Sequence, residues 1–260
     1  MLQLRQAQMQ SLHDAAVRSF ENGMLSHLQA FAPALIKTIP ESQTRTMIRF
    51  GIARASRYGF DLRGPVRLYL EMMLLLGSCF DTDPQYPWAS DALFDKVARP
   101  QLDRAQQLYA RLISYRERVN GPDDAYLLQA LRVIERSAMV WRPPPGPVLA
   151  ETMTSTLSLL YPQKAQYISN GRLASLVALG KEAAEKYQLP AAHGAPLCSV
   201  LIFMFGHGCC DDPMLPWLTR TLKDQRSVSD QDRVTRLQKR ALIWLHHAIS
   251  HFEQKTSHAI

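Results

Sequence analysis

Apolar and polar residues follow a helical period along most of the chain. In the first segment, about residues 3–30, Leu12, Val17, Phe20, Met24 and Leu28 recur at helical spacing opposite charged and amide side chains. Similar stripes predict helices at about 42–58, 65–76, 87–97, 101–119, 123–139, 148–160, 172–187, 196–205, 215–223 and 230–253. No stretch alternates with the period of two that is typical of a strand between hairpin turns. The pattern predicts an all-α fold.

Several helix ends carry their own signals. Gly59 is placed to stop the helix at 42–58, and Pro65 stands in the first turn of the next helix. Asp123 or Asp124 would lie in the first turn of the helix that runs to about residue 139. Ser229, with Asp232 three residues later, is an Asp variant of the capping box. These residues predict where the helices begin and end.

One stretch of the sequence occurs twice. Residues 77–88 read GSCFDTDPQYPW, and residues 206–217 read GHGCCDDPMLPW, at a constant offset of 129 residues. Aligned without gaps over 44 positions, 50–93 and 179–222 share ten identities, where random pairing would give roughly three. The identities within the loop are Gly77, Asp83, Pro84, Pro87 and Trp88, which match Gly206, Asp212, Pro213, Pro216 and Trp217. The chain therefore contains a tandem repeat.

The repeat predicts how the chain is divided. Residues 1–120 and 148–260 would form two helical lobes of roughly five helices each, related by a pseudo-twofold axis. Residues 121–147 would form a connecting helix followed by a proline-rich linker, Trp141–Pro147, that favours an extended conformation.

Turn chemistry accounts for every residue that the two loops share. An Asp before Pro can accept backbone N–H groups of the next turn, and Pro87 and Pro216 can open the helices that follow. Gly77 and Gly206 would supply a left-handed helix stop, while Trp88 and Trp217 would fill the core. On this interpretation the repeated motif is structural.

The loops also suggest a chemical alternative. Asp81 and Asp83 form a DxD, and Asp211 and Asp212 are adjacent, so the four carboxylates could hold Mg²⁺ in a metal-dependent enzyme. Only Asp83 and Asp212 persist in both copies, however, and no glycine-rich phosphate loop accompanies them. We therefore expect neither a metal site nor a catalytic residue.

The remaining soft ligands do not change this expectation. His207, Cys209 and Cys210 match no zinc spacing. His247 and His251 are four residues apart, but Ala248 stands where a zinc protease has Glu. A helix end with two half-buried thiols explains the first group, a solvated helix face explains the two histidines of the last helix, and no cofactor is implied.

Composition limits the class of protein. The 260 residues carry a formal charge of +7, but no stretch forms a basic block, which argues against nucleic-acid binding. The four Cys form no CxxC pair, the N-terminus lacks a secretory signal, and no apolar run is long enough to span a membrane. The sequence predicts a cytoplasmic protein with reduced thiols.

The first repeat resembles a known group of proteins. Tyr58-Gly59-Phe60, Leu74-Leu75-Leu76-Gly77, Phe80-Asp81-Thr82-Asp83-Pro84 and Pro87-Trp88 look like helical accessory proteins encoded beside the VgrG spike and PAAR-tipped effectors of bacterial type VI secretion systems. The opening is similar as well, at Leu4 to Met9, Phe20-Glu21 and Met24 to Phe31. The likeness covers roughly the first 120 residues, and the second lobe joins it through the repeat.

The resemblance implies binding rather than catalysis. Such proteins act as chaperones, co-chaperones or adaptors that help load an effector onto the spike, and they bring no catalytic residues to this chain. The expected partner is therefore an effector, an adaptor or a spike component, with the binding surface and the oligomeric state left open. The alternatives are the metal-dependent enzyme and an immunity protein that neutralises an effector.

Overall fold

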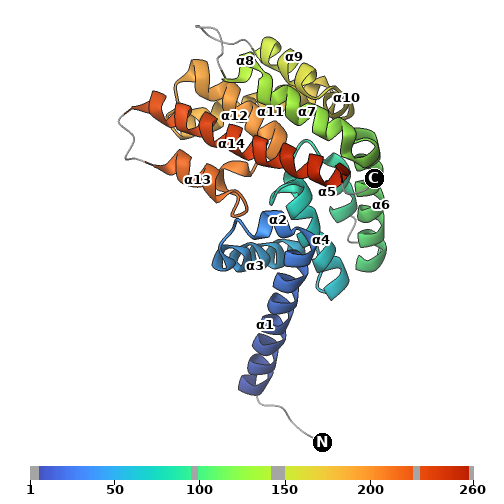
Figure 1. Cartoon of the computed structure of the whole chain (residues 1–260). Coiled ribbons are helices and arrows are strands. Elements are labelled where there is room, and N and C mark those ends of the chain that lie inside the picture. The colour runs from blue at the N-terminus through green and yellow to red at the C-terminus, as the bar shows by residue number, and fades with distance from the viewer. Residues whose placement is uncertain (1–5, 95–98, 142–149, 225–228, 258–260) are drawn as a thin grey trace, which may run out of the picture.

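The computed structural model describes residues 6–94, 99–141, 150–224 and 229–257. Helices make up nearly all of these ranges, and no strand occurs in them (Figure 1). The all-α class expected from the period of the sequence is confirmed.

The first repeat contributes α1 to α6. Their bounds are α1 Gln6–Phe31, α2 Pro33–Ile36, α3 Glu41–Arg57, α4 Arg63–Leu76, the 3-10 turn η1 Phe80–Thr82, α5 Pro87–Phe94 and α6 Gln101–Val119. The connection holds η2 Pro122–Asp124, α7 Ala125–Arg136 and α8 Ala138–Trp141. Most of the predicted proline-rich linker, residues 142–147, lies outside the described residues.

The second repeat contributes α9 Ala150–Leu160, α10 Pro162–Ile168, α11 Asn170–Lys186, α12 Ala191–Phe205, η3 Cys209–Asp211, α13 Pro216–Lys223 and α14 Asp230–Ser257. Its elements follow the order of the first. The pairs α3 and α11, η1 and η3, and α5 and α13 each begin and end 129 residues apart. The offset found in the sequence therefore recurs in the local structure. The pseudo-twofold relation of two whole lobes stays a prediction.

Some predicted boundaries were wrong. The structure adds a short helix to each repeat, α2 and α10, both of which begin at a proline. α12 begins at Ala191 rather than at Pro196, which lies inside the helix. Asp123 and Asp124 have positive φ values of 50° and 59° and precede α7, so they do not lie in its first turn.

Two shared glycines explain how closely the helices pack. A Cβ on Gly180 of α11 would lie 2.7 Å from the backbone of Ser199 in α12. A Cβ on Gly51 of α3 would overlap the side chains of Leu70 and Met73 in α4. Both repeats therefore use a glycine at the crossing of the same helix pair, where no side chain fits.

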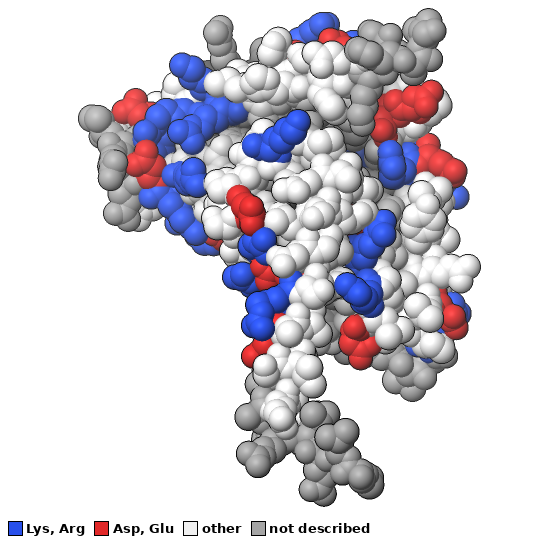
Figure 2. All heavy atoms as spheres, turned by 60° about the horizontal axis from the view of Figure 1, so that its bottom comes forward, with Lys and Arg blue, Asp and Glu red and all other residues white. Residues whose placement is uncertain are grey.

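α1 extends away from the rest of the molecule (Figure 1). Met24 and Leu28 are buried as their spacing predicts, but Leu12 is 59% exposed and Val17 is 37% exposed. The predicted stripe is therefore half right, because the tertiary structure covers only the C-terminal part of this helix. Figure 2 shows that Lys and Arg are mostly interspersed with Asp and Glu on the face that it presents.

None of the described helices combines the length and the apolar character that crossing a membrane requires.

Candidate functional site

The two copies of the repeated loop meet at the junction between the repeats. α4 ends at Gly77 (φ 98°, ψ 151°) and α12 ends at Gly206 (φ 92°, ψ 159°). The positive φ values were predicted, but the extended ψ values place both residues outside the left-handed helical region, in a region open essentially to glycine alone. A 3-10 turn follows in each copy and leads to Asp83 or Asp212.

Each shared aspartate holds its own turn. Asp83 Oδ1 accepts the backbone N–H of Gln85 at 2.8 Å, and Asp212 Oδ1 accepts that of Met214 at the same distance. Pro87 and Pro216 then open α5 and α13. This is the turn chemistry that the sequence predicts for an Asp-Pro corner.

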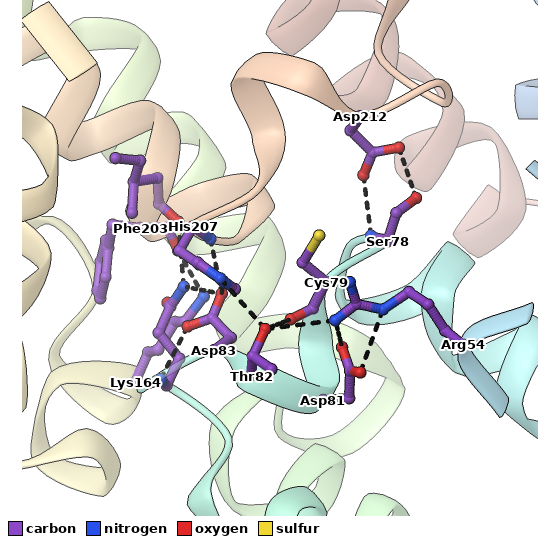
Figure 3. A network of polar contacts seen from close by, with 12 residues as sticks. Arg54, Ser78, Cys79, Asp81, Thr82, Asp83, Lys164, Phe203, His207 and Asp212 are labelled. Atoms are coloured by element: carbon purple, nitrogen blue, oxygen red, sulfur yellow. Dashed lines mark hydrogen bonds and ion pairs between the residues drawn. The ribbon is translucent and has the colours of Figure 1, made fainter. Parts of the chain in front are cut away.

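The second oxygen of each carboxylate reaches the opposite repeat. Asp83 Oδ2 accepts the backbone N–H of His207 at 2.7 Å, and Asp212 Oδ2 accepts that of Ser78 at 2.9 Å (Figure 3). Ser78 and His207 occupy equivalent positions of the repeat. The contact is therefore exchanged in both directions, which is the pattern of a two-fold contact between like surfaces.

The glycines bring the two backbones together at the same place. A Cβ on Gly77 would overlap the carbonyl oxygen of Phe205, and a Cβ on Gly206 would lie 3.1 Å from that of Leu76. Leu76 and Phe205 are again equivalent. The shared glycines are thus required both by the helix ends and by the close approach of the repeats.

The carboxylates at this junction are buried. Asp83 and Asp212 are each 4% exposed, and Ser78 Oγ donates a further bond to Asp212 at 2.6 Å. Burial raises the pKa of Asp212, although the bonds from Ser78 and Met214 oppose the shift. The carboxylates of the two shared aspartates therefore bind the two repeats to each other.

The unshared aspartates have other partners. Asp81 pairs with Arg54 and accepts the hydroxyl of Tyr58 at 2.8 Å. Asp211 pairs with Lys186 at 2.9 Å and with Lys223 at 2.8 Å. Tyr187, the counterpart of Tyr58, donates to Asp211 at 3.3 Å. The same tyrosine thus meets a carboxylate in both repeats, although the two carboxylates are one position out of register.

The proposed four-carboxylate cluster does not form. Asp83 and Asp212 face backbone donors, while Asp81 and Asp211 face separate cations. Across the described ranges, no three His, Cys, Asp or Glu side chains are placed to ligate one metal ion. His207 lies against Asp83 with Nδ1 3.2 Å from Oδ2, and all four cysteines are free thiols.

The shared tryptophans differ in burial. Trp88 is 8% exposed and packs in the core, whereas Trp217 is only partly buried against it. Arg111 donates to the carbonyl of Trp88 at 2.8 Å, and the equivalent Arg240 approaches that of Trp217 at 3.5 Å. The prediction that both indoles fill the core holds fully for the first repeat alone.

A groove of about 570 Å³ lies over the junction, between α3 and α11. Its walls include Phe50 and Leu179, which are equivalent positions of the repeat. Its floor includes Cys79, His207 and Asp211 from the two loops. Burial raises the pKa of the Cys79 thiol, so that this thiol does not have the character of a reactive thiolate. The groove is a mixed apolar and polar surface suited to binding.

Lys164 is a residue that the sequence reasoning missed. It lies on α10 with 4% of its surface exposed, and it donates to the carbonyl of Phe203 (Figure 3). Its position is equivalent to Leu35, so a charged residue replaces an apolar one between the repeats. That replacement was the signal available in the sequence.

Comparison with known proteins adds no relative. Protein-family models, curated proteins and solved structures all returned no match to this chain. The structure itself defines an all-α protein in which the two copies of a repeated loop meet through reciprocal Asp–backbone contacts.

Proposed function

We propose that the chain is a non-enzymatic binding protein. It acts in the cytoplasm of the producing bacterium and helps to load an effector onto the spike of a type VI secretion system. Its partner is an effector, an adaptor or a VgrG or PAAR spike component. The proposal rests on the likeness of residues 58–60, 74–77, 80–84 and 87–88 to accessory proteins of such loci.

The observation that carries the binding role is the groove between α3 and α11. The aspartates that the two loops share make contacts inside the protein. The oxygens of Asp83 and Asp212 accept backbone N–H groups of their own turns and of the opposite repeat. What faces solvent above them is a groove with Phe50, 37% exposed, on one wall and Leu179 on the other. An extended or helical segment of a partner protein can place apolar side chains between these walls.

The experiment uses the full chain and effectors encoded in the same locus. Co-expression followed by purification through a tag on the effector tests for a complex, and a deletion strain tests secretion of that effector. We expect the complex to form and secretion to fall. Unchanged secretion together with unchanged effector abundance in the deletion strain contradicts the proposal.

The groove itself is tested by the double variant Phe50→Asp with Leu179→Asp. Placing two carboxylates on the walls should reduce effector capture by about tenfold or more, because desolvating a charge in the interface is costly. Leu159→Asp is the matched control, since Leu159 is 73% exposed on α9 and outside the groove. Capture that survives the double variant would exclude the groove as the binding site. Capture that is lost in Leu159→Asp would place the binding site on α9.

A co-expression assay separates the loading role from immunity. An immunity protein protects cells from the toxic effector, whereas a loading factor need not do so. Full protection by this chain without any effect on secretion would favour the immunity alternative.

A further inference from the structure

A second cavity, of about 330 Å³, lies between the repeats and shares only Asp212 with the groove. Its walls come from α2, α4, α6, α7, α10, α12, α14 and adjoining loops, and most of the residues in them are apolar. The volume falls within the range of small-molecule sites, which are typically apolar with a few placed polar groups.

Six equivalent pairs of residues line this cavity, and in three of them both members are apolar: Leu74 with Phe203, Leu75 with Met204 and Leu76 with Phe205. In the other three pairs one member carries an ammonium or phenol group that its equivalent lacks: Lys164 with Leu35, Tyr86 with Leu215, and Tyr115 with Trp244. The lining therefore breaks the equivalence of the repeats at three positions.

The polar members of these pairs lie together. Lys164 Nζ is 5.8 Å from the ring centroid of Tyr86, and the rings of Tyr86 and Tyr115 are 5.4 Å apart. Of the apolar members, Trp244 packs against Phe205 with ring centroids 4.6 Å apart. The cavity therefore brings an ammonium and two phenol rings together within a lining that is otherwise mostly apolar.

Two cationic residues line this cavity, and of these Arg116 is paired with Asp124 at 3.2 Å, whereas Lys164 is buried. It has three N–H donors, of which one reaches the carbonyl oxygen of Phe203. Nζ also lies over the rings of Tyr86 and Phe203, at 5.8 Å and 5.0 Å from their centroids. Among the described residues no carboxylate forms an ion pair with it, although the charge of Asp83 acts on it from a greater distance. A buried ammonium without a direct ion pair attracts an anion that brings its own negative charge.

An apolar residue is accommodated at the equivalent position, since Leu35 is there in the first repeat and lines the same cavity. The fold alone therefore does not demand an amine. Burial lowers the pKa of Lys164 to about 8, against the opposing effect of the Asp83 charge. The lysine is costly to the fold, which favours a role in binding.

We propose that this cavity binds a small amphipathic acid. The carboxylate of the ligand pairs with Lys164, and its apolar chain lies against the apolar residues of the lining, which include Leu35, Leu215 and Trp244. This site is independent of the proposed effector-loading role.

The first test compares three ligands of equal chain length on the full chain. Decanoate, 1-decanol and decyltrimethylammonium share the apolar body and differ in the charge of the head group. Isothermal titration calorimetry, at concentrations where each ligand is monomeric, should show decanoate binding about tenfold or more tighter than decanol, with the cation weaker still. Equal affinity for all three, or no binding of decanoate, overturns the proposal.

The second test removes the amine. Lys164→Met keeps the length of the side chain and should weaken decanoate by about tenfold or more while leaving decanol unchanged. Lys181→Met, on the exposed face of α11, is the matched control and should bind both ligands as the wild type does. Decanoate affinity that is unchanged in Lys164→Met overturns the proposal. If Lys164→Met does not fold by circular dichroism, the ligand comparison on the wild-type chain decides.

Discussion

At the scale of single residues, the shared aspartates do more than the sequence suggested. The Asp-Pro pattern predicts that each carboxylate caps its own turn, and Asp83 and Asp212 do so. Each also accepts a backbone N–H from the other repeat, at His207 or at Ser78. One side chain thus satisfies a local and a long-range donor, so that both turns depend on the junction being closed.

Asp212→Ala should lower the free energy of unfolding by about 2 kcal/mol or more, because it leaves the backbone N–H groups of Ser78 and Met214 buried without an acceptor. Urea unfolding followed by circular dichroism measures the change. Asp103→Ala, at an exposed position in the first turn of α6, is the control and should cost less than about 1 kcal/mol. Equal losses in the two variants would mean that the contact across the junction contributes nothing measurable.

At the scale of the helices, the helical period of apolar residues and the residues that begin or end helices predict most elements well. α6, Gln101–Val119, begins and ends at the predicted residues, because Pro100 and an amphipathic stripe mark it. α12 was predicted to begin at Pro196, but it begins at Ala191. Its first turn contains Ala191, Ala192, His193 and Gly194, which form no apolar stripe. Pro196 was predicted to be the first residue of the helix, because proline is favoured at that position. Of these four residues only Gly194 is buried, so neither periodicity nor burial marks this turn.

The shared glycines allow a prediction about helix packing. Gly180→Ala should be more destabilising than Gly51→Ala, at about 1 to 3 kcal/mol, since its Cβ meets the backbone of α12 rather than flexible side-chain ends.

Gly171→Ala, where nothing lies within 4 Å of the added Cβ, should instead stabilise α11 by about 0.5 to 1 kcal/mol. Thermal unfolding of the three variants tests the order. A Gly180→Ala variant as stable as the wild type would show that α11 and α12 can move apart freely.

At the scale of the whole molecule, equivalent positions of the two repeats carry different residues in the space between them. The junction is reciprocal, whereas the cavity beside it pairs Lys164 with Leu35 and Tyr115 with Trp244. The second repeat therefore buries a charged side chain at a position where the first repeat has an apolar one. Its cost gives stability a dependence on pH that can be measured.

Lys164 binds its proton less tightly in the folded state, with a pKa of about 8 against an ordinary value of 10.5. Between these values the unfolded chain holds more protons, so the contribution of Lys164 to stability rises with pH. The difference in unfolding free energy between the wild type and Lys164→Met should therefore shift in favour of the wild type from pH 8 to pH 10.5, by up to about 3 kcal/mol.

Neighbouring groups do not obscure this comparison. Asp83 faces Lys164, and Tyr86, Tyr115 and Tyr161 line the same cavity, but all of them are present in both proteins. Urea unfolding at several pH values measures the difference, and Lys181→Met should show no such trend. A difference that stays constant with pH would contradict the lowered pKa of Lys164.

The sequence by itself determined the helical class, the tandem repeat and the turn chemistry at Asp83-Pro84 and Asp212-Pro213. These follow from local periods, from residues with restricted backbone angles and from an offset of 129 positions, all of which can be read along one chain. The tertiary structure alone decided that the carboxylates reach across to Ser78 and His207. It also decided that Leu12 and Val17 are left uncovered and that Lys164 is enclosed beside Tyr86. Each of these depends on which surfaces of distant helices meet, and the spacing of residues along a chain does not encode that directly.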